Sequence, residues 1–151
     1  MYEKLNTVTI GGHKLPIKCD FNILQILQEN FGTLKKFEQA LIGMVPILDK
    51  DGNQIYEIGP NGEEAIKFKT TEPSLKAIAL TLPMMINEGR IQAEAQGDKI
   101  DDFDYKAAIK EADFSILEVA VDLHNEYRRC FDRKKLTVSK RTATKKQQST
   151  L

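Results

Sequence analysis

Polar and apolar positions alternate on both sides of a Gly-Gly pair near the start of the chain. Residues 5–10 alternate over most of their length, and residues 13–18 resume the alternation after Gly11-Gly12. Two glycines can adopt the positive φ angles of a tight hairpin turn, and Pro16 lacks the amide hydrogen that an inner strand needs. The pattern predicts an antiparallel β-hairpin with the proline on an edge strand.

Apolar residues then follow helical spacing over two short stretches. Asp20 has a side chain suited to cap a helix that runs from Phe21 to Gly32. Thr33 is equally suited to cap a second helix that ends at Gly43, since glycine commonly terminates helices. We expect two consecutive helices after the hairpin.

The helical spacing is interrupted between residues 44 and 71. Apolar runs at 45–48 and 54–58 flank a reverse-turn sequence rich in Asp, Gly and Asn, and a second turn sequence precedes a strand-like run at 65–69. We therefore expect an inserted β-hairpin or small meander over residues 44–71.

A longer helical pattern runs from Pro73 to about Gly97. Its apolar positions cover more than half of the helix circumference, which is typical of a helix in a core or at a partner interface. Pro83 removes a backbone donor, so we expect the helix to be kinked or divided there. An acidic connector at 98–104 and a short helix at 105–111 follow.

The last predicted helix begins after Asp113 and ends near Phe131. Its apolar face, which includes Leu117 and Val121, is also wider than one core contact needs. Residues 133–151 contain too few apolar side chains to fold, so they are predicted to form a disordered basic tail.

Together these elements predict a single α+β domain, mainly α-helical, over residues 1–132. A chain of 151 residues can bury a sizeable core without disulfides or metals. Its hydrophobic share of 41% and charged share of 29% are ordinary for a folded domain, so composition excludes disorder of the whole chain.

The cysteine content and the first residues indicate a protein of the cytoplasm. Cys19 and Cys130 are far apart in sequence and suggest no disulfide framework, which favours a reducing compartment. The chain does not open with a basic region followed by an apolar run, and no apolar stretch approaches membrane-spanning length. We expect a cytoplasmic protein without a membrane partner.

Few residues are candidates for catalysis or metal binding. His13 and His124 each precede a cysteine by six positions, a spacing that structural zinc sites do not favour. The acidic turn around Gly52 would place isoleucines at the first and last ligand positions of an EF-hand loop. A Gly-rich phosphate loop after a strand and a Gly-x-Ser-x-Gly elbow are both missing from the sequence. We expect no catalytic residue, no cofactor and no metal.

The charge is unevenly distributed, although the formal net charge is zero. Residues 133–151 contain seven Lys/Arg and no acid, whereas residues 1–132 contain fifteen Lys/Arg against twenty-two Asp/Glu, a balance of −7. A basic tail can bind nucleic-acid phosphates in a salt-dependent way. The tail lacks aromatic residues for base stacking, so a small nucleic-acid-binding regulator is the alternative hypothesis and not the first one.

Three stretches together resemble the tail assembly chaperones of long-tailed, siphovirus-type bacteriophages and prophages. They are the opening hairpin of residues 8–18 with Asp20-Phe-Asn22 and Glu29-Asn-Phe-Gly32, the apolar helix ending in Asn87-Glu-Gly89, and the closing amphipathic helix with its charged tail. The inserted element at 44–71 departs from the family pattern.

The resemblance implies a non-enzymatic chaperone that is absent from the mature virion. Such a protein binds the long tape measure protein and helps to recruit tail tube subunits (the major tail protein) during virion assembly, and self-association is compatible with that role. Apolar residues beyond those that one core stripe needs would contact the partner. We select as interface candidates Leu80, Met84, Met85, Ile91 and Leu123.

Overall fold

The computed structural model describes the backbone of residues 4–149 and the side chains of residues 4–132. Its elements in chain order are β1 (Asn6–Ile10), β2 (His13–Ile17), α1 (Phe21–Phe31), α2 (Leu34–Ile42), β3 (Met44–Pro46), β4 (Tyr56–Ile58), β5 (Glu64–Ile66), β6 (Phe68–Thr70), α3 (Leu75–Ala95), α4 (Tyr105–Lys110) and α5 (Ile116–Ser149). The predicted fold class is confirmed: the described residues form an α+β domain that is mainly helical, with small antiparallel hairpins.

The N-terminal hairpin has the predicted turn. Strands β1 and β2 pair antiparallel, and Ile10 lies opposite His13 across the two glycines. Gly11 and Gly12 have φ angles of 58° and 80°, which are the positive values of a two-residue turn that matches strand twist. One face of the hairpin is fully buried through Val8, Ile10, Leu15 and Ile17.

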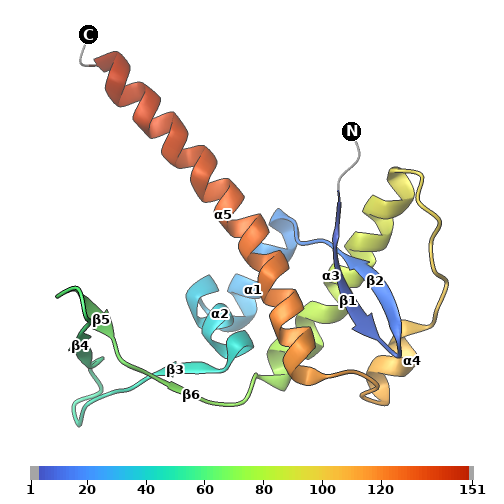
Figure 1. The fold of residues 1–151 in the computed structure, drawn as a ribbon, viewed down its shortest axis with the longest axis horizontal. Coiled ribbons are helices and arrows are strands. Elements are labelled where there is room, and N and C mark those ends of the chain that lie inside the picture. Colours follow the sequence, from blue (N-terminus) through green and yellow to red (C-terminus); the bar gives the residue numbers. More distant parts are fainter. Residues whose placement is uncertain (1–3, 150–151) are drawn as a thin grey trace.

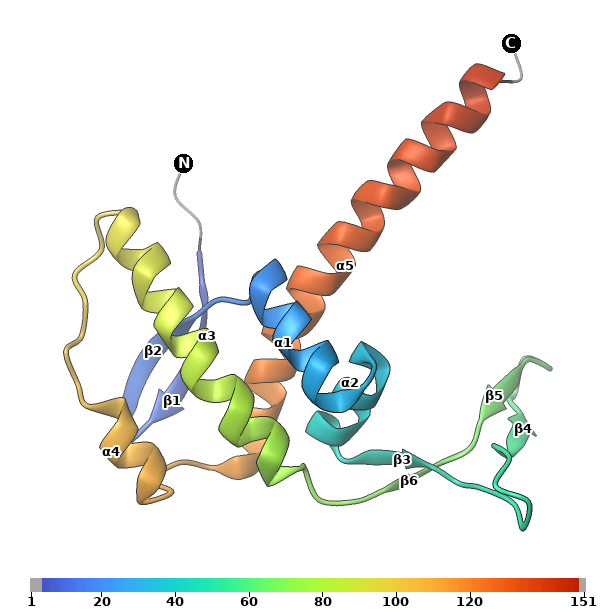
Figure 2. The same ribbon diagram turned by 180° about the vertical axis from the view of Figure 1, so that it is seen from behind.

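This buried face packs against α3 and α5, and α1 and α2 close the other side of the core (Figures 1 and 2). The contact between β2 and α3 brings backbone against backbone at Gly89. A Cβ atom added at Gly89 would lie 2.6 Å from the Cα atom of Ile17 and would overlap the carbonyl group of Pro16. The amide of Lys18 also donates to the Met85 carbonyl at 2.9 Å. Glycine at 89 therefore allows the strand to lie on the helix.

The caps of α1 and α2 agree with the prediction. The Asp20 carboxylate accepts the amide hydrogen of Ile23 at 2.9 Å, and the Thr33 hydroxyl accepts that of Lys36 at 3.0 Å. Gly43 ends α2 in the left-handed conformation. These contacts satisfy amides that the first helical turn leaves without a partner.

Helix α3 continues through Pro83, so the helix is not divided there. Proline there leaves the carbonyl of Ala79 without its helical donor. Ala79 lies on the exposed side of α3, so water can take the place of the missing amide. The helix also starts later than expected, since Ser74 caps it by accepting the Ala77 amide at 3.2 Å.

Helix α5 differs from the prediction at both ends. It begins at Ile116 after a cap by Ser115 and not by Asp113, because the Ser115 hydroxyl accepts the Glu118 amide at 3.3 Å. It continues past the predicted end at Phe131, and the backbone of the predicted disordered tail is helical through Ser149. Residues 132–149 contain no glycine or proline that would stop a helix. This part projects away from the body (Figure 1), and residues 150 and 151 lie outside the described range.

The inserted β element is a projecting arm, which we define as residues 44–70. Its stem pairs β3 with β6 and its tip pairs β4 with β5. The apolar runs 45–48 and 54–58 meet across their turn at a single bridge between Leu48 and Gln54. Three backbone hydrogen bonds join the stem to the tip. The Ile47 amide donates to the Lys67 carbonyl, the Lys67 amide donates to the Ile55 carbonyl, and the Ile55 amide donates to the Ile47 carbonyl. None of the 27 residues from 44 to 70 is buried.

Candidate partner-binding surfaces

The five interface candidates chosen from the sequence do not share one surface. Met85 and Leu123 are fully buried, and both belong to the core, so their selection was wrong. Leu80 and Met84 are half-buried and pack against the same core. Ile91 remains exposed, with 53% of its surface accessible. Burial removes Met85 and Leu123 as contact residues, because α3 packs against β2 and α5.

A compact exposed apolar patch lies instead on the first turns of α5. Leu117 and Val121 are 68% and 58% exposed, and Ile116 beside them is 38% exposed. Because Leu117 and Val121 are four positions apart, they form one ridge along the helix. We call Ile116, Leu117 and Val121 the α5 ridge.

The α5 ridge borders a shallow surface depression of about 330 Å³, whose rim includes Glu118 and Asp122. Partial burial raises the pKa of the Asp122 carboxyl, and the neighbouring Glu118 carboxylate raises it further. Partial burial has this effect because it disfavours the charged form of a carboxyl group. The patch therefore combines apolar side chains with two acids at its edge.

The arm carries the second group of exposed apolar side chains. Val45 and Leu48 lie near its stem and are 39% and 54% exposed, whereas Tyr56 and Ile58 lie in the tip and are 57% and 75% exposed. An isolated two-stranded hairpin is at best marginally stable in water. An arm without a buried residue is therefore a second candidate for contact with a partner.

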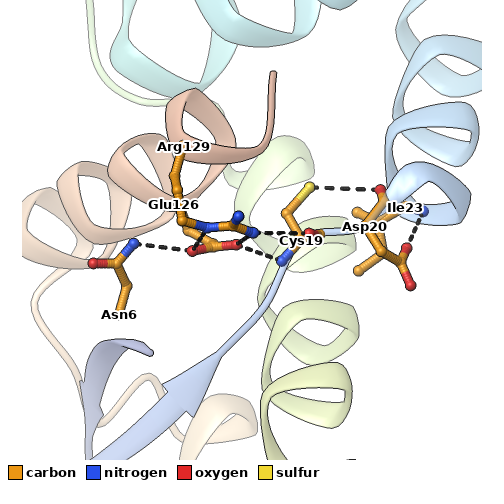
Figure 3. Close-up of polar contacts among 6 residues, drawn as sticks. All are labelled: Asn6, Cys19, Asp20, Ile23, Glu126 and Arg129. Carbon is orange, nitrogen blue, oxygen red and sulfur yellow. Dashed lines mark hydrogen bonds and ion pairs between the residues drawn. The ribbon is translucent and has the colours of Figure 1, made fainter. Parts of the chain in front are cut away.

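A buried carboxylate joins the hairpin to α5 through four hydrogen bonds (Figure 3). Glu126 is 1% exposed, and its oxygens accept the Asn6 amide side chain at 2.9 Å and the Cys19 backbone amide at 2.6 Å. Arg129 donates to both oxygens of Glu126, at 2.8 and 2.5 Å, and to the Cys19 carbonyl at 3.1 Å. The carboxylate is thus fully paired, which indicates a structural role.

The fold brings together the two cysteines that are distant in sequence. Cys19 and Cys130 are 1% and 4% exposed, and neither forms a disulfide. A hydrogen bond with Cys130 raises the pKa of the Cys19 thiol, and burial raises it further. A thiol with a raised pKa is a poor nucleophile at neutral pH, which fits a structural role for the pair.

Both histidines pair with carboxylates from other elements. His13 lies 2.8 Å from Asp101 and stacks on Phe103 with ring centroids 3.9 Å apart, so the hairpin turn is joined to the connector before α4. His124 lies 2.8 Å from Glu38, as expected for a partly buried helix residue. These contacts join distant segments and converge on no common site.

Within residues 4–132, no group of three or more His, Cys, Asp or Glu side chains could hold a metal ion. Among the described helices, none combines the length and the apolar character needed to span a membrane. Comparisons of the chain with models of protein families, with curated proteins and with solved structures find no significant match.

The α5 ridge was missed from the sequence because the apolar stripe of the last helix is wide. The side that enters the core consists of Val119, Ala120, Leu123, Tyr127 and Cys130. The ridge residues are as apolar as these and share the helical spacing. The one useful signal is Glu118 and Asp122, two acids beside the ridge that mark that side of the helix as accessible.

Proposed function

We propose that this chain is a non-enzymatic protein-binding factor that acts as a tail assembly chaperone of a long-tailed bacteriophage or prophage. In this role it binds the tape measure protein in the host cytoplasm and helps to recruit tail tube subunits, without remaining in the mature virion. The observation that supports binding is the α5 ridge, where Leu117 and Val121 expose most of their surface beside the core. The phage assignment is supported by the resemblance of the opening hairpin and the two long helices.

The α5 ridge suits a helical partner. Two apolar side chains four positions apart form a ridge that fits between the side chains of a second helix. Burying a Leu or Val side chain contributes roughly 1.5–3 kcal/mol. Glu118 and Asp122 at the rim favour basic residues beside the apolar face of the partner. A long, helical and partly apolar tape measure protein has these properties.

Co-expression with the tape measure protein of the same genome tests the proposal. The wild-type chain is expected to keep that protein soluble. Substituting both Leu117→Asp and Val121→Asp should weaken binding by more than about 100-fold, since it removes roughly 3 kcal/mol or more. The matched control is Lys106→Asp, an exposed position on α4. A tape measure protein that stays insoluble with the wild-type chain, or that remains soluble with the double variant, would contradict the proposed site.

The gene order offers an independent test of the phage assignment. A tail assembly chaperone gene is expected between a tail tube gene and a very long tape measure gene. Any other surrounding gene order, with no tail genes nearby, would remove the phage part of the proposal and leave only a binding protein.

A second candidate function is nucleic-acid binding by the basic segment 133–151. The observation that favours it is that α5 carries the first part of this segment away from the body as a helix through Ser149 (Figure 1). Removing residues 133–151 should then abolish binding to DNA and RNA in a low-salt fluorescence anisotropy assay. Binding by the intact chain should weaken steeply as salt rises. No binding by the intact chain would dismiss this candidate.

A further inference from the structure

The tip of the arm combines an apolar face with negative charge. We define the tip as residues 56–66, which contain three glutamates and no Lys or Arg. In the β4–β5 pairing Tyr56 lies opposite Ile66 and Ile58 opposite Glu64. Residues opposite each other in an antiparallel pair lie on the same face, and every second residue along one strand lies on that face too. Tyr56, Ile58 and Ile66 therefore share one face of the tip. Ile58 is 75% exposed, the largest fraction among the exposed large hydrophobic residues.

A groove of complementary character lies where the arm leaves the body. We define the groove as the depression of about 290 Å³ between α2 and the arm stem, with Lys35, Lys36 and Gln39 on one side and Val45, Pro46 and Leu48 on the other. The lining includes two lysines and no carboxylate. Val45 and Leu48 are exposed, so the side of the groove formed by the stem offers apolar contact. Its lysines have no salt bridge within the described part of the chain.

The tip cannot fill the groove of its own chain. The stem of the arm forms one wall of the groove, and the tip lies at the far end of the arm, away from α2 (Figures 1 and 2). The branch point formed by Ile47, Ile55 and Lys67 joins stem and tip through three backbone hydrogen bonds, which opposes folding the tip back. A tip that enters this groove therefore comes from another copy of the chain.

We propose that the tip of one copy of this chain docks in the groove of a second copy. Ile58 and Tyr56 would enter between α2 and the stem, while Glu63 and Glu64 lie beside Lys35 and Lys36. The complementary charges, Glu63 and Glu64 against Lys35 and Lys36, favour a second copy over an arbitrary apolar partner. The contact also covers an arm that has no buried residue of its own.

Because the tip and the groove are different surfaces, one contact leaves a free groove on the first copy and a free tip on the second. Such a head-to-tail contact forms rings if the rotation closes and open chains if it does not. The contact involves one small hairpin, so we expect weak association that grows with concentration and declines with salt. The α5 ridge takes no part in it, so this inference and the proposed tape measure site succeed or fail separately.

Sedimentation velocity of the full chain over a concentration series tests the proposal. The wild-type average mass should rise with concentration beyond that of a dimer. Ile58→Asp in the tip, and the pair Lys35→Glu and Lys36→Glu in the groove, should each reduce the association constant at least about tenfold. The matched controls are Ile91→Asp, another exposed isoleucine, and the pair Lys106→Glu and Lys110→Glu on α4. Both controls should associate like the wild type.

Mixing the two defective variants separates a head-to-tail contact from a symmetric one. The tip variant keeps an intact groove and the groove variant keeps an intact tip, so a mixture should form 1:1 dimers and nothing larger. Circular dichroism should be unchanged, because the tip and groove residues lie outside the core. A wild-type chain that stays monomeric, variants that associate normally, or a mixture that forms no dimer would each overturn the proposal.

Discussion

Glu126 shows how a single buried residue can fix the relation between distant segments. Its carboxylate satisfies Asn6 of β1, the Cys19 amide after β2 and Arg129 of α5 (Figure 3). A buried carboxylate is costly unless every lone pair is used, and here both oxygens accept more than one hydrogen bond. The main effect of this contact is therefore to fix the orientation of the hairpin on α5, and its net contribution to stability is small.

Removing this carboxylate leaves several buried donors without an acceptor. We expect Glu126→Ala to lower the free energy of unfolding by about 3 kcal/mol. The measurement is urea denaturation followed by circular dichroism. Asn125→Ala, at the adjacent exposed position, should change the free energy by no more than about 0.5 kcal/mol. Equal effects of the two substitutions would show that the buried network contributes nothing specific.

At the scale of elements, the contact of β2 with α3 depends on Gly89. We expect Gly89→Ala to lower the free energy of unfolding by roughly 3 kcal/mol, because its Cβ would enter the backbone of Pro16 and Ile17. The control Asn87→Ala lies on the exposed side of the same helix and should be neutral or slightly stabilising, since alanine favours helix. Thermal denaturation of both variants provides the comparison. A stable Gly89→Ala protein would mean that strand and helix can move apart freely.

The connector before α4 is joined to the hairpin turn by a contact that depends on pH. The hydrogen bond with His13 lowers the pKa of Asp101 below its ordinary value of 3.8, and the Phe103 amide lowers it further. A lowered pKa in the folded state means that the ionised carboxylate stabilises the fold above pH 3.8. That contribution disappears as the pH falls through the folded-state pKa.

Comparison of the wild type with Asp101→Asn isolates this contribution. The difference in unfolding free energy should have its full value just above the ordinary aspartate range and should shrink as the pH falls below it. Urea denaturation at a series of pH values measures the difference. A difference that persists undiminished in strong acid would assign the effect of Asp101→Asn to packing and not to ionisation.

At the scale of the whole molecule, the body and the arm contribute differently to stability. The body contains the whole buried core, whereas no residue of the arm is buried. The amide of Thr71 donates to the Gly43 carbonyl at 2.6 Å, so the two ends of the arm are close together. Replacing residues 45–69 by a short Gly-Ser turn should therefore change the unfolding free energy by no more than about 1 kcal/mol. Loss of the cooperative thermal transition in that variant would show that the arm belongs to the core.

The sequence by itself determined most of the local structure. The alternation around Gly11-Gly12, the caps Asp20 and Thr33, and the α+β class all follow from backbone preferences and side-chain periodicity, which are properties of neighbouring residues. The same local rules predicted β structure over residues 44–71 but not its strand partners, because turn signals identify strand ends and not strand partners.

Only the tertiary structure decided which apolar residues are core and which are surface. Met85 and Leu123 became buried and Leu117 and Val121 stayed exposed, although all four lie on wide apolar helical faces. Which apolar residues are buried depends on the position of the N-terminal hairpin against the helices. That position depends on the close backbone contact at Gly89, on the hydrogen bonds of Glu126 and on the contact between Cys19 and Cys130. Such contacts between distant residues leave no periodic trace in a single chain. For that reason the sequence indicated a binding protein, and the fold was needed to locate the α5 ridge, the tip and the groove.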